Sequence, residues 1–334
     1  MGVWVMTYQK DSNDIALKAK IRLLVLAFSF SLFTTSITTG TTLQNIKSPK
    51  CTTLRRMARV YMAFGEYAKA QPLAEQALTL AKTSDVSDSE LAMCLLDLAT
   101  LYNSQNKLLD AEKMCTLGLQ LQKKTLYKGH PYVAYTLRTL GSIYKEQGKY
   151  SQASSALDEA MAIMSESHTE NDKALIPFWV DIASLLVAKR DFEEAESYYN
   201  KAMTFINSSY GPNHLYTANV LGYVAKLYTL QERYDEAEEL IDRTIATQEK
   251  IYGPDNHLVA PSWLTKARIC QAKGNYDHSE KLIEKALASV RKSGNMGIFT
   301  KLEHRVEEIR AGKQAASSPV AKAIDVDNEI SIPK

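Results

Sequence analysis

Three histidines stand in loops of similar sequence and could, by residue type, bind a transition metal. They are His130, His214 and His257, in the loops Gly-His-Pro, Gly-Pro-Asn-His and Gly-Pro-Asp-Asn-His. Imidazole is a common zinc ligand. However, the loops recur at equivalent points of a helical repeat, and whole helix pairs, with helices roughly 8 to 10 Å apart, separate such points in a stack. The three side chains cannot converge on one ion, so we interpret them as loop-capping residues and predict no metal site.

The four cysteines, Cys51, Cys94, Cys115 and Cys270, are the other residues that could do chemistry. They show no C-x-x-C and no paired ligand spacing, so neither a zinc site nor a disulfide framework is indicated. Cys115 and Cys270 fall at apolar positions of the repeat, and Cys94 directly precedes the apolar position of Leu95. We therefore interpret the cysteines as small buried hydrophobic residues.

Common catalytic motifs are absent from the chain. It contains no phosphate-binding G-x-x-x-x-G-K, no H-E-x-x-H and no G-x-S-x-G. We expect a non-enzymatic protein without a cofactor; the catalytic alternative is a hydrolase whose site is built from scattered residues. The 40 basic and 38 acidic residues give a net charge of +2, which lacks the basic excess of a nucleic-acid-binding protein. A charged binding surface on this protein must therefore be local rather than a property of the whole chain.

The first forty residues differ in kind from the rest. Lys18, Lys20 and Arg22 precede an apolar run from residue 23 to residue 33, and a Ser/Thr-rich stretch follows to Gly40. This order is typical of a secretory signal peptide, and an uncleaved membrane anchor is the main alternative. A buried helix or a mistaken start is the third interpretation. The sequence therefore favours an exported protein, periplasmic or secreted, or one anchored to a membrane through residues 1–40 alone.

Small residues recur at a fixed period through the rest of the chain. Consecutive members of the first column are 41 residues apart once and then 42 residues apart four times: Ala58, Ala99, Gly141, Ala183, Ala225 and Ala267. A second column follows twelve residues later and a third seven residues after that, for example Ala153 and Ala160. Large residues keep the same phase, such as Leu137 and Tyr144, and an aromatic residue such as Tyr150 usually follows the turn. Small residues allow two helices to approach closely, so the columns predict stacked helix pairs.

These columns resemble the tetratricopeptide signature, as in Leu137-x2-Leu140-Gly141-x2-Tyr144 followed by Tyr150, Ala153 and Ala160. The period and the Gly-Pro-Asn-His loops are similar to those of kinesin light chains, and the resemblance covers about residues 51–292. It implies an all-α right-handed α-α superhelix, a solenoid of six helix-turn-helix repeats. Lys266, Gly118 and Thr244 depart from the pattern, at positions where Leu, Ala and Ala are expected.

The repeat and the flanking composition together suggest a division of the chain. We expect a signal peptide or anchor (1–40), a linker (41–50), the repeat array with a C-terminal capping helix (51–312), and a disordered tail (313–334). Ile298, Leu302, Val306 and Ile309 recur at helical spacing and define the cap.

In tetratricopeptide proteins, the outward positions of the first helix of each repeat line a concave groove, so the resemblance implies that the chain binds a protein or an extended peptide there. The residues at these positions are Arg55, Arg59, Met62, Asn103, Tyr135, Arg138, Lys145, Asn219, Lys226 and Arg268, with only Glu146 opposing their charge. Arg and Lys could hold carboxylates of an acidic peptide while Asn bonds its backbone. A solvated charged face is the plainer interpretation.

The alternative role is that of a regulatory or assembly subunit that binds through acidic residues of the second helices. These residues are Glu193, Glu194, Glu196, Asp235, Glu236, Glu238 and Glu239. The sequence indicates no oligomeric state.

Overall fold

The computed structural model describes residues 50–84, 86–127, 129–167 and 173–293, and residues 299, 302, 303, 306, 307 and 309–311. The expected signal peptide or anchor, all but the last residue of the expected linker, and the expected disordered tail lie outside the described residues. No described helix is both long enough and apolar enough to cross a membrane.

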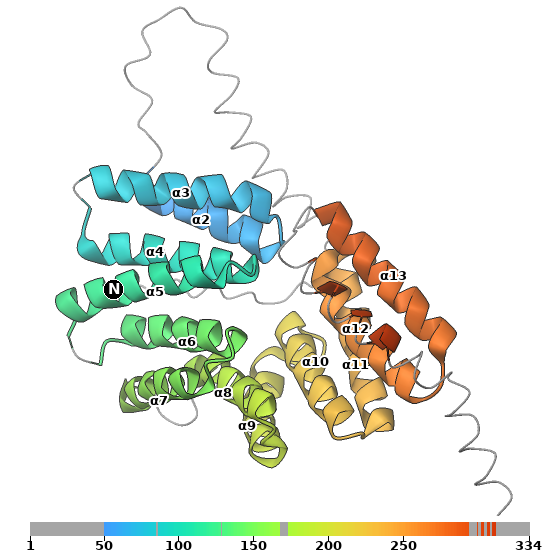
Figure 1. Ribbon diagram of the computed structural model, residues 1–334. Coiled ribbons are helices and arrows are strands. Elements are labelled where there is room, and N and C mark those ends of the chain that lie inside the picture. The colour runs from blue at the N-terminus through green and yellow to red at the C-terminus, as the bar shows by residue number, and fades with distance from the viewer. Residues whose placement is uncertain are drawn as a thin grey trace, which may run out of the picture. The chain divides into compact units, whose positions relative to one another are not determined.

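The described elements are helices joined in consecutive pairs (Figure 1). We call the first helix of each pair helix A and the second helix B. The pairs are α2 (Cys51–Ala63) with α3 (Tyr67–Thr83), α4 (Asp88–Ser104) with α5 (Leu108–Thr125), α6 (Pro131–Glu146) with α7 (Tyr150–Ser167), α8 (Ile176–Lys189) with α9 (Phe192–Tyr210), α10 (Leu215–Leu230) with α11 (Tyr234–Tyr252), and α12 (Ala260–Ala272) with α13 (Tyr276–Ser293). Short 3₁₀ turns, η1 (Lys173–Leu175) and η2 (His257–Val259), precede α8 and α12. The predicted all-α fold of six helix pairs is confirmed.

A residue with left-handed backbone follows each A helix within two residues and reverses the chain in a short turn. These residues are Gly65, Asn106, Gly148, Arg190, Glu232 and Gly274, with φ between 60° and 78°. Helix B begins two residues later in every pair, at the predicted turn aromatic or, in α5, at Leu108. The turn therefore fixes where helix B starts, and the aromatic side chain marks that start.

The first column of small residues marks the closest approach of helices A and B. Its five alanines have no exposed surface. A Cβ atom on the remaining member, Gly141, would lie only 2.8 Å from Cγ of Leu157 on α7. A larger side chain at these positions would push the two helices apart, as the spacing predicts.

Two departures from the expected column residues are accommodated without a break in the array. A Cβ atom on Gly118 would lie 3.3 Å from the carbonyl oxygen of Ala92, so the helices are close there too. Thr244 is fully buried and donates a hydrogen bond to the carbonyl oxygen of Ala218, at 3.0 Å. Its hydroxyl thus has a partner, which removes the cost of burying a polar group.

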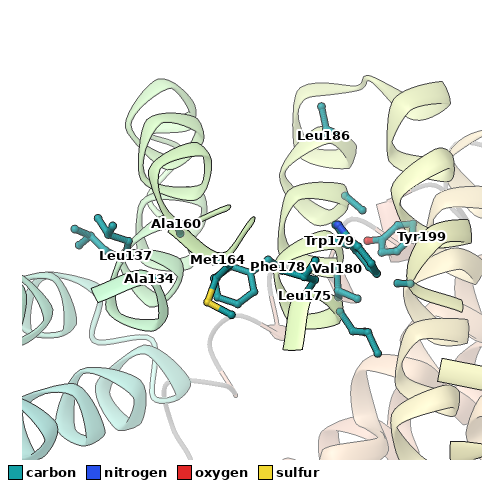
Figure 2. Packing of buried hydrophobic residues seen from close by; sticks show 14 of the residues in the cluster. Ala134, Leu137, Ala160, Met164, Leu175, Phe178, Trp179, Val180, Leu186 and Tyr199 are labelled. Carbon is teal, nitrogen blue, oxygen red and sulfur yellow. The ribbon is translucent and has the colours of Figure 1, made fainter. Parts of the chain in front are cut away.

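Large apolar residues fill the space between successive pairs. Figure 2 shows Met164 of α7 and Phe178 of α8 between the two helices, with Trp179 facing Tyr199 of α9. All four side chains expose 5% of their surface or less. Each pair therefore contributes half of the core that it shares with its neighbour, as in other repeat proteins.

The A helices lie on the inner side of the stack. Each A helix contacts the next A helix directly, from α2 to α12, whereas the described B helices show no comparable contacts with one another. Helices on the inner side of a curved stack come closer together than those on the outer side. A ligand that runs along the array therefore meets the A helices when it binds on that side.

The C-terminal cap is present where the structure describes it. Phe299, Leu302, Val306 and Ile309 are buried in one cluster with Trp263 and other residues of η2, α12 and α13. The charged residues between them that are described, such as Glu303, are exposed. Ile298, the first residue of the predicted cap, lies outside the described residues.

Candidate functional site

The inner face carries one polar residue directly after each member of the first small-residue column. This row is Arg59, Thr100, Ser142, Ser184, Lys226 and Arg268, one residue from each A helix. Every member is exposed or half-buried, with cations at the two ends and hydroxyls in the middle. The row contains no carboxylate. Hydroxyl and cationic side chains in this order can bond the backbone and the carboxylates of an extended chain.

Arg55, the first predicted site residue, belongs to the protein interior. The residue is 8% exposed, and its side chain donates hydrogen bonds to Asp97 Oδ2 at 2.7 Å and to Glu90 Oε1 at 3.1 Å, both on α4. Burial raises the pKa of Asp97, although the Arg55 charge opposes this shift. Arg55 therefore ties α2 to α4, and two carboxylates already neutralise its charge.

A second charged group joins α6 to α8. Arg138 Nη1 donates to Asp181 Oδ2 at 3.2 Å, and its guanidinium lies 5.5 Å from the centre of the Phe178 ring. Lys145 Nζ donates to Ser184 Oγ at 2.8 Å, and burial lowers the pKa of this lysine, although Asp181 opposes the shift. The expectation that only Glu146 opposes the positive charge is wrong, because Asp97, Asp181 and Glu90 face the arginines.

Tyrosines that the sequence reasoning missed lie beside this group. Tyr223 of α10 is 45% exposed and stacks on the buried Tyr199, with ring centroids 6.3 Å apart and planes at 6°. Burial also raises the pKa of Tyr223, secondarily supported by the Asp181 charge. The Tyr223 side chain is therefore in contact with solvent and also packed against the protein. An available signal was that Tyr223 occupies the same repeat position as Asp97 and Asp181, two residues before the small residue.

Lys226 and Arg268 come together at the C-terminal end of the row. With Thr229, Leu230, Leu264, Thr265 and Ile309, they line a cavity of about 20 Å³ between α10 and α12. This volume holds about one water molecule and no peptide side chain. The two cations can therefore act on a ligand that lies over the surface, but the cavity itself is no binding pocket.

The other predicted site residues are spread along the array. Asn219 Oδ1 accepts a hydrogen bond from Gln248 Nε2 at 2.9 Å, so this amide already has a protein partner. Met62, Asn103 and Tyr135 are half-buried on α2, α4 and α6. The ten predicted residues thus lie on five of the six A helices and do not converge on one point. They could serve an extended ligand and could not form a compact pocket.

Several acidic residues of the B helices are held in ion pairs. Glu196 bonds Arg233 at 3.1 Å, and Glu238 bonds Lys266 and Lys273, both at 2.6 Å. Lys266, which replaces an expected core leucine, is 7% exposed and also reaches Asp242 at 2.8 Å. These carboxylates connect successive repeats, so the predicted acidic face is partly used for stability.

The Glu238 pairs predict an acid-sensitive part of the stability. Hydrogen bonds from Lys266 and Lys273 lower the pKa of Glu238 from its ordinary value, although burial opposes the shift. A carboxylate with a lowered pKa stabilises the fold at higher pH, and this contribution is lost as the pH falls through the folded-state pKa. Glu238→Gln should therefore reduce the free energy of unfolding by about 1 kcal/mol at pH 7. In urea titrations followed by circular dichroism, the difference from wild type should shrink below pH 4; a difference that stays constant would contradict this assignment.

Two loop histidines cap helices, as predicted, and the third does not. Nδ1 of His130 and of His214 each accept a hydrogen bond from the backbone N–H two residues later, at 3.1 Å. In the last loop Asn256 takes this role, through Oδ1 and the N–H of Leu258 at 2.9 Å. His257 instead lies inside η2 and is 8% exposed. The 3₁₀ turn before α12 shifts the cap by one residue.

Family models match most of the described chain. The model of the MalT-like TPR region matches residues 49–214, and a tetratricopeptide repeat model matches residues 218–292. No curated protein matches the chain. The matched residues are those that form the helix pairs.

Solved structures of low sequence identity share this fold. The structure of NprR in complex with its cognate peptide NprX has a TM-score of 0.61 at 14% identity and covers 95% of this chain and 87% of that one. The Rap protein complexed with Competence and Sporulation Factor has a TM-score of 0.56 at 12% identity, with coverage of 79% and 75%. BtubC (BKLC) from P. vanneervenii has a TM-score of 0.50 at 20% identity, with coverage of 69% and 91%. At these identities the likeness concerns the fold alone.

Proposed function

Since the chain belongs to the tetratricopeptide-repeat family, we propose that it is a non-catalytic scaffold that holds an extended, acidic peptide segment of a partner protein along its A helices. The observation that carries this proposal is the carboxylate-free row on the inner face. Arg59, Lys226 and Arg268 supply its exposed positive charges. Ser142 and Ser184 supply hydroxyls between them.

Ion pairs between successive A helices fix the backbone that carries this row. Arg55 with Asp97 and Arg138 with Asp181 each join one A helix to the next. Because these groups hold neighbouring A helices in place, the row is ordered before a ligand arrives, and a preorganised site loses less entropy on binding. We therefore assign the predicted cations two roles: the exposed cations of the row meet the ligand, and the cations paired with the next A helix position the helices.

The similar structures are consistent with this kind of ligand. NprR was solved with a peptide and the Rap protein with a factor, both on this fold. A shared fold does not imply a shared ligand, because recognition depends on the residues of the binding site. The acidic character of the peptide therefore rests on the row of this chain alone.

Charge reversal tests the proposal directly. Arg59→Glu, Lys226→Glu and Arg268→Glu together should raise the Kd for a labelled 12-residue peptide of alternating Glu and Ser by about tenfold at low salt, because exposed ion pairs contribute roughly 0.2–1 kcal/mol each. Fluorescence anisotropy measures the change. High salt should weaken wild-type binding, since the contacts are exposed.

A matched control reverses three exposed cations on B helices: Lys113→Glu, Lys201→Glu and Arg243→Glu. This variant has the same net charge as the first, so it separates a local effect from a global one. The proposal requires that the control keeps wild-type affinity and that the Gln-Ser version of the peptide binds weakly. Equal loss in both triple variants would show general attraction to a charged protein and would refute the assigned face.

A further inference from the structure

Two cysteines of different repeats meet in the interior at the N-terminal end of the array. Sγ of Cys51, the first residue of α2, lies 3.2 Å from Sγ of Cys94 on α4. The side chains are 5% and 1% exposed, and the Cys51 thiol also points at the carbonyl oxygen of Ala77 on α3, at 3.4 Å. The two sulfur atoms need to approach by only about 1 Å to reach disulfide bonding distance.

The surrounding charges favour a dithiol over a metal site. Glu90 places a carboxylate oxygen within 4.8 Å of both sulfur atoms, which gives three potential metal ligands. However, Arg55 Nη1 donates to Glu90 Oε1 at 3.1 Å. A metal ion bound to Glu90 would compete with the Arg55 guanidinium for this carboxylate, and the two positive charges would repel each other. The sulfur pair requires no such rearrangement.

We propose that Cys51 and Cys94 form a reversible disulfide that staples the first helix pair to the second, by thiol–disulfide exchange with a low-molecular-weight disulfide such as oxidised glutathione. The Cys51 thiol is the more exposed of the two and loses its proton to solvent. Its thiolate attacks the small disulfide, forms a mixed disulfide and releases one small thiolate. Cys94 then loses its proton and attacks Cys51 Sγ, which releases the second small thiolate. Two protein thiols are oxidised, and one small disulfide is reduced to two thiols.

The environment controls the rate of this exchange. Burial raises the pKa of Cys51 and of Cys94, so few thiolates form at neutral pH. At Cys51 the hydrogen bond with Cys94 and the Arg55 charge lower the pKa, whereas the Glu90 charge adds to the rise. Exchange should therefore be slow at pH 7 and speed up about tenfold per pH unit below the thiol pKa.

The position in the array gives the bond its effect. Among the described residues, the first helix pair packs along its length against one other pair, α4 with α5, and meets η2 at its turn, where the ring centroids of Tyr67 and His257 lie 6.2 Å apart. A pair packed along one side opens more easily than a pair packed along both sides. The bond would join residues 43 apart in sequence and hold the first described helix to the next A helix. Oxidation should raise Tm by about 5 °C or more and slow amide exchange chiefly in α2 and α3.

Free-thiol counting on the full-length protein tests the proposal. The chain has four cysteines, all free thiols in this structure. After incubation with oxidised glutathione, acid quenching and denaturation, maleimide–polyethylene glycol should modify two of them, and a non-reducing digest should contain one linked peptide pair with Cys51 and Cys94. Dithiothreitol should restore all four. The wild-type chain supplies this readout, so the test does not depend on the folding of a variant.

Matched variants assign the bond. Cys51→Ala and Cys94→Ala should each abolish the linked peptides, whereas Cys115→Ala and Cys270→Ala, at buried positions elsewhere, should retain them. Four modifiable thiols after incubation would overturn the proposal, and so would a glutathione adduct that persists on Cys51. Stoichiometric zinc, released when the thiols are modified and detected with a chromogenic chelator, would also overturn it in favour of a metal site.

Discussion

Trp263→Ala is expected to lower the free energy of unfolding of the last repeat by about 3–5 kcal/mol, the usual cost of removing a large buried aromatic side chain. Trp263 is 1% exposed and packs with Leu302 and Val306 of the cap. Its Nε1 donates to Glu249 Oε1 at 3.1 Å, and Lys285 Nζ lies 4.4 Å from its ring centre. The substitution would therefore remove apolar contacts, a hydrogen bond and a cation–π contact together.

The loss should be local, because the described helix pairs pack along their length against their sequence neighbours. The first pair also meets η2 at its turn, where the ring centroids of Tyr67 and His257 lie 6.2 Å apart. Hydrogen exchange read by mass spectrometry should show reduced protection in α12 and α13, with α4 to α7 unchanged. Tyr223→Ala is the control, because this aromatic residue on the preceding A helix is 45% exposed and should cost less than about 1 kcal/mol. An equal loss of protection in α4 to α7 would contradict nearest-neighbour stability.

The fold could be predicted from the sequence because one physical requirement recurs at every pair. Wherever helices A and B cross, a side chain larger than alanine collides, as the contact between Gly141 and Leu157 illustrates. This requirement leaves a period of about 42 residues that is visible without coordinates. The cap at His257 was mispredicted because an asparagine precedes the histidine in this loop and in the loop of His214, and only the 3₁₀ turn η2 makes Asn256 the residue that accepts the backbone N–H.

The candidate site was predicted only in part. The repeat period shows which residues lie on A helices, but it does not show which of their side chains form ion pairs. The sequence places Arg55 and Arg138 on A helices, yet it does not show that each meets a carboxylate on the next A helix. A signal was nevertheless present, because Asp97 lies 42 residues after Arg55 and Asp181 lies 43 residues after Arg138. Oppositely charged residues one period apart occupy neighbouring A helices and can pair.

The same spacing rule would have found the cysteine pair. Cys51 and Cys94 are 43 residues apart, close to one period, and therefore lie on consecutive A helices. No local motif such as C-x-x-C marks them, because the contact is made across repeats. In a solenoid, residues one period apart in the sequence are neighbours in space, so a pair of reactive side chains can be recognised by that spacing.

Asp97→Leu is expected to destabilise the protein by about 3 kcal/mol or more, because it leaves a buried guanidinium with Glu90 as its remaining partner. Arg55 and Asp97 side chains are 9% and 11% exposed, so water cannot replace the lost partner. Urea unfolding followed by circular dichroism measures the loss, and hydrogen exchange should place it in α2 and α4. The control is Asp235→Leu, which removes a 92% exposed partner of Lys273 and should cost less than about 1 kcal/mol.

A double variant separates the strength of the pair from the cost of an unpaired charge. Replacing both partners, Arg55→Met with Asp97→Leu, should recover most of the loss, since apolar residues of similar volume often replace a buried ion pair without net destabilisation. Recovery would mean that the pair fixes the register of α2 on α4 more than it stabilises the fold. If the double variant is as unstable as Asp97→Leu alone, the favourable interaction between the two charges exceeds their desolvation cost. In that case the pair would be a main source of stability for the inner face at this end of the array.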